Sequence, residues 1–118
     1  MSVGVLRALQ ERLAAFAAAR DWEQFHSPKN LAMALSVEAA ELVEEFQWLT
    51  EEQSKALDPE RRGRVRLELA DVFIYLLRLS DRLGVDLLAA ANDKIALNEQ
   101  KYPAARVRGD ARKYTEYD

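Results

Sequence analysis

The segment Val37–Leu49, VEAAELVEEFQWL, reads as an α-helix with one side facing a protein core. Leu42 and Phe46 continue an apolar stripe that begins at Leu31, with the spacing of a helix face. Glu38 occupies the position in that stripe where another apolar residue is expected. Burial of an uncompensated carboxylate is unfavourable, so this glutamate calls for a chemical explanation.

Helical periodicity extends outward from this segment in both directions. Between residues 59 and 83, apolar residues recur from Val65 to Leu83 with alternating steps of four and three, and no stretch alternates like a strand. Helices of this length with short connections favour an all-α, four-helix bundle-like fold. The predicted helices are 3–20, 28–48, 51–57, 59–83 and 87–101.

Residues with known capping preferences stand at the predicted ends of these helices. Serine or aspartate precedes proline at two starts, a threonine and a glutamine form a capping-box pattern, and a glycine can close a helix. A third proline ends the last helix. These positions are Ser27-Pro28, Asp58-Pro59, Thr50 with Gln53, Gly84, Asp86 and Pro103.

Length and composition limit the possible classes of protein. The 118 residues suffice for one domain, which we place at 1–103, followed by an extended or mobile tail at 104–118. The absence of cysteine excludes thiolate chemistry, and a net charge of −3 does not favour nucleic-acid binding. No apolar run is long enough to span a bilayer and no leader is evident, so we expect a cytoplasmic protein without a membrane partner.

Two pairs of carboxylates suggest a metal site. Glu38 and Glu41 stand three residues apart, which on a helix means about 4.5 Å of rise and about 60° of rotation. Glu68 and Asp71 repeat the spacing within another apolar stripe, so the two pairs can face one another. Ligands that are all oxygens favour Mg²⁺ or Mn²⁺, ions that usually act on phosphates. The alternative interpretation is a solvated acidic surface, because glutamates at this spacing are common on exposed helices.

Several segments together resemble the MazG-like all-α nucleoside triphosphate pyrophosphohydrolases, in particular their dCTP pyrophosphatase branch. The resemblance covers roughly residues 5–117. It is carried by the paired ExxE and ExxD motifs and by RDWEQFHSPKNL, EAAELVEEFQW, LELADVFIYLLRL, VDLLAAANDKIALNEQKYP and RKYTE.

The resemblance implies Mg²⁺-dependent hydrolysis of a nucleoside triphosphate to the monophosphate and pyrophosphate, in a dimer or a dimer of dimers. It implies metal binding by Glu38, Glu41, Glu68 and Asp71, while Glu41 and Glu44 are alternative catalytic bases. Lysines are candidates for phosphate contacts, because a triphosphate carries more charge than one or two Mg²⁺ ions neutralise. The expected substrate-binding residues are Trp22, His26, Lys29, Trp48, Tyr75, Lys94 and Asn98.

Two departures from the branch leave base selectivity open. Animal members carry a histidine in the first helix where this chain has Leu13, and the stretch between the second and third long helices is shorter here. A (deoxy)cytidine triphosphate, such as dCTP or a 5-modified form, is the first expectation. The alternatives are a broader house-cleaning hydrolase for non-standard nucleotides and a non-enzymatic oligomeric helical module that binds a basic partner.

Overall fold

The computed structural model describes residues 3–109, and every regular element among them is helical. The chain divides into two compact units, Met1–Val85 and Asp86–Asp118. No helix in the described part is long and apolar enough to cross a membrane. The elements are α1 (Val3–Ala19), η1 (Glu23–Phe25), α2 (Pro28–Glu44), α3 (Glu51–Ser54), α4 (Pro59–Leu83), α5 (Leu87–Lys101) and α6 (Ala104–Val107). The all-α class is therefore confirmed, whereas the four-helix arrangement stays a prediction.

The predicted capping residues act as helix caps. The Ser27 hydroxyl accepts a hydrogen bond from the Asn30 amide, and the Asp58 carboxylate accepts one from the Arg61 amide. The remaining caps follow the same logic: a reciprocal box between Thr50 and Gln53, an aspartate cap at Asp86, and Gly84 in the left-handed conformation with φ 67°. Each cap pairs backbone groups that a helix end leaves without partners.

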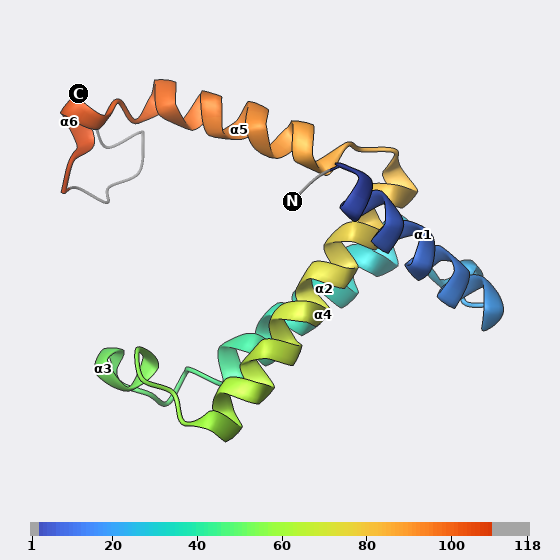
Figure 1. Cartoon of the computed structure of the whole chain (residues 1–118), viewed down its shortest axis with the longest axis horizontal. Helices are drawn as coiled ribbons and strands as arrows, with labels where there is room; N and C mark the ends of the chain where they lie inside the picture. Colours follow the sequence, from blue (N-terminus) through green and yellow to red (C-terminus); the bar gives the residue numbers. More distant parts are fainter. Residues whose placement is uncertain (1–2, 110–118) are drawn as a thin grey trace. The chain divides into compact units, whose positions relative to one another are not determined.

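The helical hairpin of α2 and α4 forms the centre of the first unit. The two helices lie side by side (Figure 1), and α1 packs against α4. Leu31 of α2 and Leu77 of α4 are each only 1% exposed, and Ala17 brings α1 into the same core. Since Glu38 and Asp71 lie on these two packed helices, the hairpin also holds the acidic residues together.

The second helix ends at Glu44, four residues earlier than the predicted boundary at 48. Beyond Glu44 the chain turns, with the Phe46 amide bonded to the Val43 carbonyl at 2.9 Å. The Arg61 guanidinium donates a hydrogen bond to the Glu45 carbonyl and so satisfies a group that a longer helix would use. Trp48 consequently lies on a turn rather than on the helix. The predicted helix 51–57 is likewise shortened to Glu51–Ser54.

Part of the predicted apolar stripe of α4 is not covered. Val65 is buried as expected, but Leu69 is 54% exposed and Leu83 is 55% exposed. On α2, Met33 and Val37 are exposed to 58% and 56%. The first unit therefore presents more apolar surface than one small hairpin needs.

The second unit consists of α5 followed by a short α6. Asp86 begins α5, and the helix ends before Pro103, as the sequence predicts. Residues 104–107 form a helical turn at the start of the segment expected to be extended or mobile, and residues 110–118 of that segment lie outside the described part.

Candidate active site

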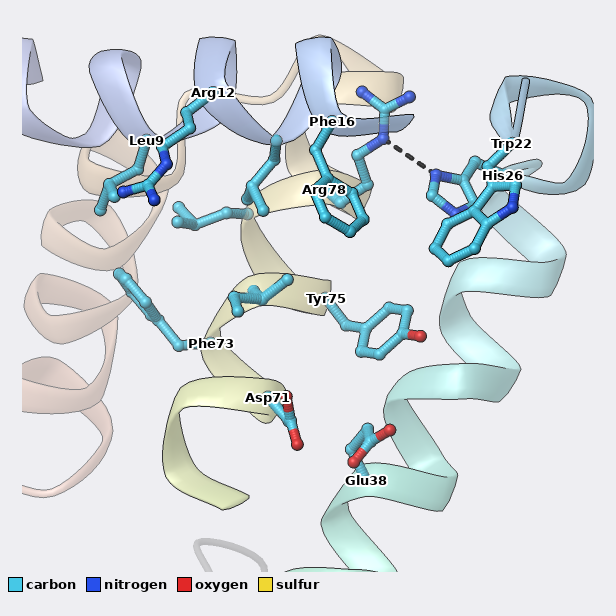
Figure 2. Close-up of a pocket in the computed structure, with 13 residues that line it drawn as sticks. Leu9, Arg12, Phe16, Trp22, His26, Glu38, Asp71, Phe73, Tyr75 and Arg78 are labelled. Carbon is cyan, nitrogen blue, oxygen red and sulfur yellow. Dashed lines mark hydrogen bonds between the residues drawn. The ribbon is translucent and has the colours of Figure 1, made fainter. Parts of the chain in front are cut away.

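Three glutamates from α2 and α4 converge on one point. Ligand oxygens of Glu38, Glu41 and Glu68 lie within 4.8 Å of one another. Asp71 lies one turn beyond Glu68 on α4, and Figure 2 shows its carboxylate close to that of Glu38. The structure thus brings Glu38, Glu41 and Glu68 together, while Asp71 lies outside that group of three and lines the same pocket as Glu38.

The electrostatics of this carboxylate cluster are unfavourable without a cation. Burial, followed by hydrogen bonding to Glu41 and the neighbouring charges, raises the pKa of Glu38 from 4.5 to about 7. Burial also raises the pKa of Glu68, with the charges of Glu41 and Asp71 adding to the effect. In both residues the dominant cause is desolvation, and the interactions with Glu41 and the other carboxylates follow.

The cluster fits a hard divalent cation. Oε2 of Glu38 and Oε2 of Glu68 are buried and have no hydrogen-bond partner among the described residues. Buried polar atoms are usually paired, so two buried carboxylate oxygens without partners, on glutamates whose ligand atoms cluster, fit a bound cation. Oxygen donors of this kind are those that Mg²⁺ and Mn²⁺ prefer.

The two remaining glutamates of the opening segment differ in their surroundings. Glu45 is only 15% exposed at its side chain, and it accepts hydrogen bonds from Arg64 Nε at 2.8 and 3.0 Å. Arg61 adds a second ion pair at 3.7 Å. Glu44 is exposed and has no ion-pair partner within the described ranges. Glu45 therefore ties α2 to α4, while Glu44 is available to solvent.

A pocket with a volume of about 520 Å³ extends from the carboxylates towards α1. This size lies within the range of small-molecule sites. Glu38 and Asp71 lie at one end of it and His26 at the other (Figure 2). The full lining is Leu9, Arg12, Leu13, Phe16, Trp22, His26, Glu38, Asp71, Phe73, Ile74, Tyr75, Leu77 and Arg78.

Aromatic rings form the end of the pocket remote from the carboxylates. The Trp22 ring meets Phe16 edge-on at a centroid distance of 5.7 Å and His26 at 6.4 Å. Asp21, the residue before this tryptophan, has a positive φ of 54°. Its left-handed conformation allows the Trp22 amide to donate a hydrogen bond to the Ala17 carbonyl at 2.9 Å. This bond fixes the position of Trp22 relative to the end of α1.

Tyr75 lies between the two ends of the pocket. It follows Asp71 by one helical turn and lines the same cavity (Figure 2). Burial raises the pKa of its hydroxyl, and the charges of Glu38 and Asp71 act in the same direction. The hydroxyl is therefore a neutral group that can donate a hydrogen bond near the acidic end.

The structure brings only some of the predicted substrate-binding residues into this pocket. Trp22, His26 and Tyr75 line it, whereas Lys29 and Trp48 are not part of its lining. Trp48 is 87% exposed, because it lies on the turn after α2. Lys94 and Asn98 belong to α5 in the other unit. These four residues remain predictions.

Arg78 was not predicted as a site residue, although its spacing on the helix indicates that it shares a face with two predicted site residues. This arginine interrupts the apolar run of α4. Tyr75 follows Asp71 by four residues, and Arg78 follows Tyr75 by three. It therefore shares their helix face. Arg12, Phe16 and Phe73 also line the pocket without having been predicted to do so, and nothing in their local pattern distinguishes them from ordinary helix residues.

The described residues define an all-α protein in which a helical hairpin carries clustered carboxylates beside an aromatic pocket. The chain belongs to the MazG-like family, whose profile matches residues 33–117.

Individual relatives agree with that membership. Human dCTP pyrophosphatase 1 is 48% identical over 105 residues, covering 87% of this chain and 62% of the human protein. The mouse protein is 50% identical with the same coverage. A pyrophosphatase of known crystal structure from Archaeoglobus fulgidus is 41% identical, with a TM-score of 0.78 over 82% of this chain and 91% of that one. The chain thus spans about 62% of the length of the curated relatives it matches.

Proposed function

We propose that this protein is a metal-dependent nucleoside triphosphate pyrophosphohydrolase that converts dCTP, or a 5-modified dCTP, to the monophosphate and pyrophosphate. The observation that carries the proposal is the carboxylate cluster, with two unpaired buried oxygens, at one end of an aromatic pocket. The names of the relatives, dCTP pyrophosphatase 1 and pyrophosphatase, support the same chemistry. Its role would be to remove such nucleotides from the cellular pool.

The carboxylates of Glu38, Glu41, Glu68 and Asp71 would hold Mg²⁺, with Mn²⁺ as a possible substitute. When bound, the cation neutralises phosphate charge and lowers the pKa of a water. The protein's own contribution is to fix four oxygen donors on two packed helices, so that little reorganisation is needed when the triphosphate arrives.

A carboxylate base removes a proton from the attacking water. The water oxygen forms a bond to one phosphorus of the α–β linkage, the bridging P–O bond breaks, and the monophosphate and pyrophosphate separate. Glu41 lies inside the cluster and Glu44 lies one turn beyond it, exposed to solvent. Both remain candidate bases. Glu44→Gln separates them, because it removes the outer carboxylate without altering the three clustered glutamates.

The apolar end of the pocket would hold the base and sugar. Trp22 offers a ring face or edge, and Tyr75 lies where a sugar would connect the base to the phosphates. Aromatic walls with a few polar groups are typical of small-molecule sites. Lys29, Lys94 and Asn98 are proposed as phosphate or sugar contacts, and Trp48 as an outer wall.

The uncovered apolar residues support a homo-oligomer, a dimer or a tetramer. Met33 and Val37 on α2, together with Leu69 on α4, are each more than half exposed. Large apolar side chains left exposed in such numbers are consistent with an interface.

The proposal is tested by incubating the purified protein with Mg²⁺ and a panel of triphosphates. We expect dCTP to yield dCMP and pyrophosphate, and chelation of the metal to stop the reaction. Specificity constants for dCTP, 5-modified dCTP, dUTP and dTTP distinguish a cytidine-directed enzyme from a broader house-cleaning hydrolase. Unchanged nucleotide across the whole panel would rule out the enzymatic function.

The remaining alternative, a non-enzymatic helical module, makes a different prediction for ligand binding. A dCTP analogue that resists hydrolysis should raise the melting temperature of the enzyme in the presence of Mg²⁺, because ligands stabilise the state that they bind. A module that binds only a basic protein partner would show no such shift.

A further inference from the structure

His26 is held by two arginines of α4. Nε of Arg78 donates a hydrogen bond to Nδ1 of the His26 ring at 3.2 Å, drawn as the dashed line in Figure 2. Nε of Arg82, one turn later, donates to the backbone carbonyl of the same histidine, also at 3.2 Å. Both the ring and the backbone of this pocket residue are therefore fixed to one helix.

The chemistry of arginine determines the protonation state of the ring. A guanidinium stays charged and can only donate hydrogen bonds, so Nδ1 of His26 must be the acceptor. The ring is then neutral and carries its proton on Nε2. Nε2 has no hydrogen-bond partner among the described residues, while the ring lines the pocket. An oriented N–H donor is thus left for a ligand.

Arg78 is an unfavourable residue for a simple helical core. It is only 4% exposed, and its NH2 nitrogen has no partner in the described part of the chain. The nearest carboxylate, Asp81, is 3.8 Å from NH1 and already accepts a hydrogen bond from Arg7 at 3.1 Å. A buried cation with such weak neutralisation opposes folding, so an apolar residue would serve the core better.

Burial and the positive charges around His26 also favour the neutral ring. Burial lowers the pKa of the imidazole first, and the positive charges of Arg78 and Arg82 lower it further. Glu23 on η1 acts in the opposite direction as the smallest contribution. The neutral ring is therefore the stable form at neutral pH.

We propose that Arg78 is a positioning residue that fixes the proton of His26 on Nε2, so that the pocket presents one oriented N–H donor to an acceptor on the nucleobase. The identity of the ligand rests on the proposed function. Cytosine offers O2 and N3 as acceptors and an amino group as a donor. A fixed N–H can therefore donate a hydrogen bond to O2 or N3 at this position, whereas the amino group offers it no acceptor.

The first test is nitrogen NMR of the full chain without a histidine tag. His26 is the single histidine of the sequence, so the imidazole signals need no assignment. We expect the wild type to show one tautomer, protonated on Nε2, and Arg78→Met to show a mixture. Arg82→Met is the matched control: it removes an arginine that contacts only the histidine backbone, so the tautomer should not change. A wild-type ring protonated on Nδ1, or an unchanged tautomer in Arg78→Met, would overturn the proposal.

The second test is a kinetic double-mutant cycle with dCTP. Arg78→Met should raise KM about tenfold, which is near the upper end of the effect expected from losing one hydrogen bond to the substrate. The value of kcat should stay within about twofold of the wild type, because the carboxylates are unchanged. In His26→Phe the ring remains but carries no N–H that an arginine could orient. Adding Arg78→Met to that variant should then have little effect on KM. Full additivity of the two changes would contradict the coupling.

If Arg78→Met does not fold, a third variant, Arg78→Lys, tests the same proposal. Arg78→Lys keeps a charged donor and should retain the Nε2–H tautomer, with a KM within about threefold of the wild type if the donor alone positions the ring. Loss of the tautomer in this folded variant would count against the proposal. A wild type that hydrolyses no triphosphate would overturn the proposed function alone, since the NMR result still decides the role of Arg78.

Discussion

Glu38 shows how one residue can be unfavourable for the fold and useful for the site. It lies on the inner side of α2, with one oxygen buried and unpaired. Its pKa of about 7 reflects burial first and the neighbouring carboxylates second. The residue therefore opposes folding of the metal-free protein at neutral pH, and the proposed cation would reverse that effect.

We predict that Glu38→Gln stabilises the metal-free protein and abolishes hydrolysis. Glutamine keeps the shape of the side chain but removes the buried charge, so the melting temperature at pH 8 should rise by roughly 4 °C, equivalent to about 1 kcal/mol. Turnover of dCTP should fall at least about 100-fold, because the proposed metal ion would lose one of its charged ligands. Thermal melts and a pyrophosphate-release assay measure the two effects, and near-normal turnover would show that the residue is not a metal ligand.

The same carboxylate predicts how the metal-free protein responds to pH. The pKa of Glu38 is raised from 4.5 to about 7 in the folded state, so the folded chain binds more protons than the unfolded chain between these values. The contribution of this group to stability is therefore present below pH 4.5 and lost as the pH rises through 7. Urea unfolding at pH 5.5 and pH 8 in the presence of a chelator should show a larger loss in the wild type than in Glu38→Gln. Equal losses in both proteins would contradict the assignment.

At the scale of elements, helix ends decide where the site residues lie. The end of α1 is set by Asp21 in the left-handed conformation, and the next residue is Trp22 of the pocket. The end of α2 is set by contacts of Glu45 with Arg61 and Arg64. Both ends adjoin the proposed site.

The left-handed residue at the end of α1 can be tested directly. Asp21→Gly should change the free energy of unfolding by no more than about 0.5 kcal/mol, because glycine adopts this conformation freely. Asp21→Val should lower it by about 1–2 kcal/mol, because a β-branched residue strongly disfavours positive φ. Chemical denaturation measures both. Similar losses in the two variants would mean that the backbone conformation is not the cause.

The ion pairs at the end of α2 distinguish two adjacent glutamates. Glu45→Gln should lower the free energy of unfolding by about 1 kcal/mol, since it weakens partly buried pairs with two arginines. Glu44→Gln should leave stability unchanged, because the side chain is exposed and unpaired within the described residues. Any loss of turnover in the folded Glu44→Gln protein would then report a catalytic role rather than a structural one.

The element boundaries and caps were largely predictable because their signals are local. Ser27 and Asp58 act on amides three residues away, a distance that the sequence shows directly. The premature end of α2 was not predictable, since it depends on arginines of another helix. Arg78 was missed for a related reason: its partner His26 lies 52 residues away in the sequence.

For the whole molecule, periodicity identified apolar faces but not what covers them. Leu31 and Leu69 occupy equivalent positions in their stripes, yet the first is 1% exposed and the second 54%. A period shows which side of a helix is apolar, whereas burial depends on the neighbour that packs there. Likewise the spacing of the carboxylates predicted their convergence, but only the fold shows which oxygens lack partners.

We predict that the protein is oligomeric and that assembly contributes to its stability. Analytical ultracentrifugation should give a mass of two or four chains. The melting temperature should rise with protein concentration, because mass action favours the folded assembly. A single-chain mass at micromolar concentration, with a melting temperature independent of concentration, would show that the uncovered apolar residues serve another purpose.

The placement of the two tryptophans gives the molecule an intrinsic optical reporter. Trp22 lines the pocket and contacts two other rings, while Trp48 is 87% exposed on a turn. Trp22 is 44% exposed, so an aqueous quencher such as iodide should reduce the emission of Trp48 more strongly and leave a residual signal enriched in that of Trp22. Entry of a nucleotide would alter this residual fluorescence, so occupancy of the pocket could be followed in real time without any label.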